Sequence, residues 1–143
     1  MKKQIIVIIL SLFSIGLFAQ NQYFKNTKET QQLSKKTVKL FYENKISEAF
    51  EQLMPYWPLP KNEIDAMKEK TIKYLNILAE RFGKPIGTIK VKNEKISEIA
   101  LRETYFIQYE NTAIRLIFTY YKNNNGWIVN AFKWDDSFTE EFK

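Results

Sequence analysis

Residues 101–134 read LRETYFIQYENTAIRLIFTYYKNNNGWIVNAFKW, and this stretch decides the fold class. Apolar and polar residues alternate along it, which is typical of strands that have one buried face. The apolar positions are Leu101, Tyr105, Ile107 and Tyr109 in one strand and Ile114, Leu116, Phe118 and Tyr120 in the next. The run from Asn123 to Gly126 favours a hairpin turn into a further strand, residues 127–134. Because residues 86–92 also have strand periodicity, we predict a four-stranded antiparallel meander.

Three helices are predicted before the meander, over about residues 26–44, 47–54 and 62–82, because apolar residues recur there at helical spacing. The expected N-caps are Asn26 or Thr27, Ser47 and Asn62. In the third helix the predicted buried stripe comprises Ile64, Met67, Thr71, Tyr74, Leu75, Leu78 and Phe82. Gly83, with Pro85 two residues later, is expected to end this helix.

Three prolines between Pro55 and Pro60 predict a stiff, extended connection between the second and third helices. Helices that come before a meander of strands indicate the α+β class. We therefore expect three N-terminal helices packed on one face of a curved four-stranded antiparallel sheet.

The N-terminus has the pattern of a secretory signal peptide, since Lys2 and Lys3 precede an uncharged run from Ile5 to Ala19. We predict a signal peptide at 1–19, cleaved near Ala19–Gln20, and a periplasmic or secreted mature protein. The run is shorter than the roughly 20 apolar residues that a membrane span needs, so no stable span is expected after cleavage. A single domain is expected at 20–134, followed by an acidic, frayed tail at 135–143.

Charge argues against a nucleic-acid partner. Loss of Lys2 and Lys3 lowers the net charge from +6 to +4, and the remaining lysines are interspersed with acidic residues. Nucleic-acid binding is favoured instead by a clustered basic stripe. No nucleic acid is therefore expected among the partners.

The chain contains no histidine and no cysteine. Their absence excludes Ser-His-Asp and Cys-His catalysis, His-ligated zinc, iron–sulfur clusters and disulfides. The four glycines form no phosphate-binding loop. We therefore expect no cofactor or metal and assign no catalytic residue. A carboxylate acting with a tyrosine remains available for proton transfer in an apolar pocket.

Five residues are candidates for lining a pocket: Tyr56, Trp57, Glu103, Tyr105 and Tyr109. Glu103 shares its strand face with Tyr105 and Tyr109, whose hydroxyls point either into a cavity or to the rim of a packed core. Tyr56 and Trp57 lie between prolines, so they form either the mouth of a pocket or a lid that plugs the gap between helices and sheet.

Other polar residues have simpler explanations. Asp65 lies in the first turn of a predicted helix, where the helix dipole favours an acid. Arg115 is expected on the outer face of the sheet, either solvated or at an interface. Phe106, Ile117 and Tyr121 share that face, and one face of residues 127–134 is expected to add aromatic surface. Exposed apolar surface often marks an interaction site, so a homodimer through the outer face is expected.

The order of these elements resembles the NTF2-like superfamily, also called cystatin-like or SnoaL-like. The resemblance lies in a third helix ending in Gly83-Lys84-Pro85 and a last strand running from Gly126 to Phe132, within residues 33–134. It implies a conical fold around a pocket, frequent homodimers, and functions that range from isomerases to ligand-holding domains. We expect an exported, non-catalytic domain that binds a small apolar ligand or a partner protein. The alternative is a small isomerase or lyase that uses a pocket carboxylate and a tyrosine.

Overall fold

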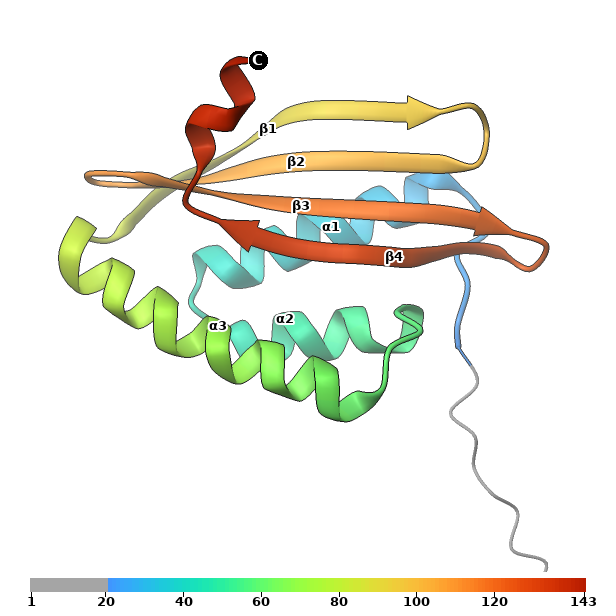
Figure 1. The fold of residues 1–143 in the computed structure, drawn as a ribbon, viewed down its shortest axis with the longest axis horizontal. Coiled ribbons are helices and arrows are strands. Elements are labelled where there is room, and N and C mark those ends of the chain that lie inside the picture. The colour runs from blue at the N-terminus through green and yellow to red at the C-terminus, as the bar shows by residue number, and fades with distance from the viewer. Residues whose placement is uncertain (1–20) are drawn as a thin grey trace, which may run out of the picture.

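The structure is a computed structural model and describes residues 21–143, so the predicted signal peptide and its cleavage position lie outside the described residues. Helices come first along the chain and a curved sheet follows them (Figure 1). The helices are α1 (Thr27–Tyr42), α2 (Ile46–Leu53) and α3 (Lys61–Phe82), the strands are β1 (Pro85–Ile96), β2 (Ala100–Tyr109), β3 (Ala113–Asn123) and β4 (Gly126–Asp135), and the short 3-10 helices are η1 (Met54–Tyr56) and η2 (Phe138–Phe142). The strands pair antiparallel in chain order. The predicted α+β class and arrangement are confirmed.

One of the three predicted helix caps is confirmed. The Asn26 side chain accepts a hydrogen bond from the backbone N–H of Glu29 at 3.1 Å and so caps α1. Ser47 and Asn62 are not caps, because α2 starts after Lys45 and α3 starts directly after Pro60. The fixed φ of a proline lets the helix begin at the next residue, which leaves Asn62 already inside α3.

The prolines predict an extended connection between α2 and α3, but only its second part is extended. The chain continues from α2 into η1, which has Pro55 in its first turn, and becomes extended only at Trp57. A proline is tolerated in a first turn because the backbone N–H that it lacks would have no helical partner there. Among residues 21–143, no helix is long and apolar enough to cross a membrane.

Aromatic rings from both layers meet in the core at Phe132. Its ring centroid lies 5.0–6.3 Å from those of Phe41, Phe50, Trp57 and Phe118, which come from two helices, the connection after η1 and β3. These separations and the tilted or edge-on orientations are those at which aromatic pairs attract one another. Phe132 therefore joins the helices to the inner face of the sheet.

A β-bulge in β4 decides which way its aromatic residues point. Val129 pairs with Tyr120 and Ala131 pairs with Thr119, so Asn130 has no partner on β3. One extra residue reverses the alternation of side chains that follow it. As a result Phe132 and Trp134 face the helices, as do Trp127 and Val129. The prediction that β4 adds aromatic surface to the outer face of the sheet is therefore wrong.

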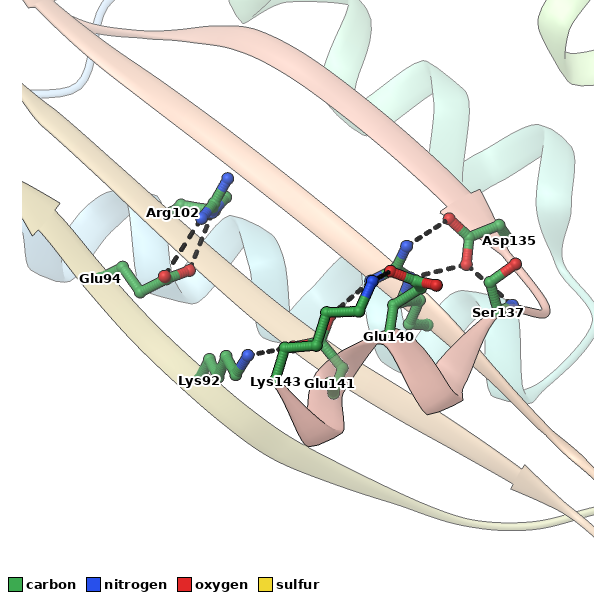
Figure 2. Close-up of polar contacts among 9 residues, drawn as sticks. Lys92, Glu94, Arg102, Asp135, Ser137, Glu140, Glu141 and Lys143 are labelled. Carbon is green, nitrogen blue, oxygen red and sulfur yellow. Dashed lines mark hydrogen bonds and ion pairs between the residues drawn. The ribbon is translucent and has the colours of Figure 1, made fainter.

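The residues after β4 are not frayed, because η2 lies across the outer face of the sheet with the helices behind it (Figure 2). Arg115 does lie on that face, but it is neither solvated nor free. Its guanidinium donates to both oxygens of Asp135, at 2.6 and 3.1 Å, and to Glu141 at 2.5 Å. Glu141 also pairs with Lys92 at 2.7 Å. The carboxylates of Asp135 and Glu141 thus neutralise the charges of Arg115 and Lys92 on the outer face of the sheet.

The tail also covers part of the apolar surface that led us to expect a homodimer. Phe138 packs edge-on against Phe106 with their centroids 6.0 Å apart, and Ile117 is buried. Tyr121 remains exposed. Association of two copies through this face stays a prediction, now with a smaller apolar surface to support it.

Acid is expected to weaken the attachment of the tail. The pKa of Glu141 is lowered by its hydrogen bond with Lys92, against the effect of burial, and with help from Arg115. Burial opposes ionisation of Asp135, but bonds from Arg115 and from the Ser137 backbone outweigh it, so its pKa is lowered too. Carboxyls with lowered pKa values stabilise the fold above their ordinary pKa values, 3.8 for Asp and 4.5 for Glu, and this contribution is lost as the pH falls through the lowered values.

The test compares the free energy of urea unfolding from pH 7 to pH 3 in the wild type and in an Asp135→Asn/Glu141→Gln variant. The wild type should be the more stable at pH 7, and the difference should shrink below about pH 4.5. A difference that does not change with pH would contradict the role given to these carboxylates.

Candidate functional site

A cleft with a volume of about 550 Å³ lies between α3 and the end of β4. This volume falls within the range of roughly 300–1,000 Å³ that is usual for small-molecule sites. Its apolar lining comprises Phe50, Met67, Tyr74, Ile77, Leu78, Phe82, Phe132 and Trp134. The cleft therefore offers a ligand mainly aromatic and aliphatic contacts.

Helix α3 forms one wall because it packs on α2 and touches the sheet at few points. The indole N–H of Trp134 donates to the hydroxyl of Thr71 at 2.9 Å, and Asn111 donates to the carbonyl of Phe82 at the end of the helix. Between these contacts Tyr74 remains 48% exposed, although the sequence predicts it within the buried stripe. After β4 the chain passes to the outer face of the sheet and forms η2 there, on the side away from α3 (Figure 2). No other described residue covers the part of α3 around Tyr74.

Cations outnumber free carboxylates around the cleft. Lys70 and Arg81 line it, and neither forms an ion pair within residues 21–143, whereas Lys133 at its edge lies between two inward-facing residues of β4 and also lines a cleft on the outer face. Of the two acids in the lining, Asp135 is held by Arg115, which leaves Asp136. The cleft therefore combines an apolar surface with unneutralised positive charge.

The two α3 cations lie close to aromatic rings of the same helix. The Nζ atom of Lys70 is 5.8 Å from the centroid of the Tyr74 ring, and the guanidinium carbon of Arg81 is 5.2 Å from that of Phe82. Such cation–π contacts favour conformations in which the charged group stays beside the ring. Both cations are thereby held next to the apolar surface of the cleft.

Tyr56 and Trp57 form a plug and not a mouth. Trp57 is buried and meets Phe132 edge-on at 6.3 Å. Tyr56 stacks on Phe24 with the ring centroids 3.8 Å apart. Of the two alternatives left open by the sequence, the structure therefore favours a lid that fills the gap between the helices and the sheet.

Glu103 is the centre of a buried polar network. Its side chain is 0% exposed, and its two carboxylate oxygens bond to Lys90 Nζ at 2.5 Å and to the Ser34 hydroxyl at 2.6 Å. Ser34 is also 2.6 Å from the Tyr120 hydroxyl, which donates to the Thr30 carbonyl at 3.0 Å. A buried charge needs such partners, and here protein groups occupy both oxygens of the carboxylate.

Tyr105 and Tyr109 are buried core residues on the inner face of β2. Burial raises the pKa of both hydroxyls, and the negative charge of Glu103 raises that of Tyr105 further. The Tyr105 hydroxyl has no hydrogen-bond partner within residues 21–143, while Lys90 Nζ lies 5.7 Å from the centroid of its ring. Both tyrosines are therefore expected to stay protonated at neutral pH.

None of the five candidate residues lines the cleft. Tyr56, Trp57, Glu103, Tyr105 and Tyr109 all lie elsewhere, in or against the core. The residues that sequence reasoning missed are Lys70, Ile77 and Arg81. Their spacing along α3 with Tyr74 was a usable signal, because positions 70, 74, 77 and 81 fall on one face of a helix.

A second cleft, of about 430 Å³, lies on the outer face of the sheet beside η2. Most of the charged side chains that line it are paired with one another, such as Arg102 with Glu94 and Lys92 with Glu141. Such a cleft suits an apolar ligand poorly, because paired charges would have to lose water when it binds. Within residues 21–143 no group of three or more acidic side chains is placed to hold a metal ion.

Comparison with known proteins gives no relative from which a function could be transferred. No protein-family model, no curated protein and no solved structure matches this chain. The candidate function therefore rests on the geometry of the cleft and on the pattern of the sequence.

Proposed function

We propose that the protein is a non-catalytic binding domain that holds a small, largely apolar ligand in the cleft between α3 and β4. The observation that carries this proposal is the exposed apolar surface of Tyr74 and Ile77, 48% and 42% accessible, inside a cleft of about 550 Å³. Apolar side chains that face a concavity are the usual lining of small-molecule sites.

The alternative of an isomerase or lyase receives less support from the same geometry. It needs a carboxylate and a tyrosine that face the ligand, and Glu103 and Tyr105 were its candidates. Glu103 is buried beside Tyr105, but it does not line the cleft and its oxygens are bonded to Lys90 and Ser34. A general base must reach the proton that it removes, and this carboxylate has no such access.

We also propose that the domain acts after export, in the periplasm or outside the cell. The support is the signal-peptide pattern of residues 1–19. Cleavage near Ala19–Gln20 would leave Phe24, which packs in the core, within the mature chain. We further propose that the domain is NTF2-like. The support is the order of its elements, three helices followed by a four-stranded meander.

The test of ligand binding uses the neutral, apolar dye Nile red and a matched pair of variants. Ile77 lines the cleft, whereas Ile86 is exposed on β1 and does not. Replacing Ile77 by glutamate places a charge against the dye and is expected to weaken its binding about tenfold or more. Ile86→Glu makes the same chemical change elsewhere and should leave the affinity unchanged.

Fluorescence titration of the wild type and of both variants provides the measurement. Saturable binding that is lost in Ile77→Glu and retained in Ile86→Glu supports the proposal. Absence of saturable binding to the wild type, or equal affinities of the two variants, would show that the cleft is not the binding site.

A further inference from the structure

We propose that the ligand is a free amphipathic anion, with an apolar body that ends in a carboxylate. This inference rests on the proposed function, because it names the chemical class of the molecule that the α3–β4 cleft would take. Its support is the arrangement of charge along α3, which an uncharged apolar ligand would leave unused.

Lys70 and Arg81 stand at the two ends of one helical stripe, with Tyr74 and Ile77 between them. At a rise of 1.5 Å per residue, the eleven steps along the helix from Lys70 to Arg81 span about 16.5 Å. An apolar chain that lies along this stripe would therefore bring its terminal group to a cation in either direction. Each cation is also held beside an aromatic ring, so it is placed near the ligand before binding.

Charge balance points to an anion and not to a cation. Lys70 and Arg81 form no ion pair within residues 21–143, while of the two acids in the lining Asp135 is bonded to Arg115, which leaves only Asp136. Beside an apolar surface the attraction between opposite charges is stronger than in open water. A carboxylate would also suit the guanidinium of Arg81, whose planar fork binds two oxygens.

The experiment compares three ligands that share one apolar chain: decanoate, 1-decanol and decylamine, titrated calorimetrically into the wild-type protein at pH 7. Decanoate is expected to bind about tenfold more tightly than decanol, and decylamine more weakly than either. The preference for decanoate should shrink as salt is added, because both cations reach solvent.

A Lys70→Gln/Arg81→Gln variant is expected to bind decanoate about tenfold more weakly than the wild type does, so that its preference for decanoate over decanol is lost. Lys73→Gln is the control, since this lysine lies on α3 but does not line the cleft. Equal affinity of the wild type for decanoate and decanol would overturn the anion inference and leave the proposed function standing. Failure of all three ligands to bind would overturn both.

Discussion

Replacing Phe132 by alanine is expected to lower the free energy of unfolding by about 3–5 kcal/mol. The ring contacts four other aromatic side chains that come from both layers of the fold. Removing it takes away this buried surface and leaves a cavity that the surrounding rings cannot fill without moving. The substitution also removes part of the wall of the α3–β4 cleft.

Urea unfolding followed by circular dichroism provides the measurement, with Phe142→Ala as the control. Phe142 is 84% exposed at the end of η2, so the same change there should cost less than about 0.5 kcal/mol. Similar losses in the two variants would mean that Phe132 does not join the layers as described. If Phe132→Ala is too unstable to purify, Phe132→Leu should show a smaller loss in the same direction.

Replacing Lys90 by methionine is expected to cost about 2–4 kcal/mol, because it leaves the Glu103 carboxylate buried without a cation. Glu103 is fully buried and bonds to Lys90 at 2.5 Å. The Lys90 side chain is 30% exposed, so water can partly solvate the Glu103 carboxylate once the lysine is gone. The expected loss of stability is therefore smaller than that for a fully buried ion pair.

A second substitution separates the charge effect from a loss of packing. Glu103→Gln removes the charge but keeps an oxygen that can accept the hydrogen bond from Ser34. The Lys90→Met/Glu103→Gln double variant should therefore be more stable than Lys90→Met alone. Lys95→Met, an exposed lysine of the same strand, should change stability little. The interpretation fails if Lys90→Met is as mild as Lys95→Met.

The sheet could be predicted from the sequence because its signals are local. Alternation places Leu101, Tyr105 and Ile107 on one face, and the structure buries all three. The predicted turn at Asn123–Gly126 is also confirmed. The Asn123 side chain accepts hydrogen bonds there from the backbone N–H groups of Asn125 and Gly126. Such patterns depend on residues that are neighbours in sequence, so they survive without knowledge of the tertiary structure.

Features that depend on distant residues could not be predicted in this way. The tail is ordered because Glu141 meets Arg115 and Lys92, which are far from it in sequence. The site shows the same limit. Alternation placed Glu103 and Tyr105 on the correct face of β2, but α1 packs against that face and leaves both side chains buried. The position of the cleft depends on how α3 stands relative to β4, which no local pattern encodes.

Asn130 is the extra residue of the β-bulge in β4 and has no partner on β3. If the same sequence paired with β3 residue by residue, without the bulge, the indole of Trp134 would face the outer side of the sheet and could no longer reach Thr71. The bulge, as much as the identity of the residues, therefore decides whether Trp134 forms a wall of the recess beside α3. Deleting Asn130 should leave that wall in place, because Ala131 would then follow Val129 in a regular ladder, whereas deleting Lys133 should turn the indole outward.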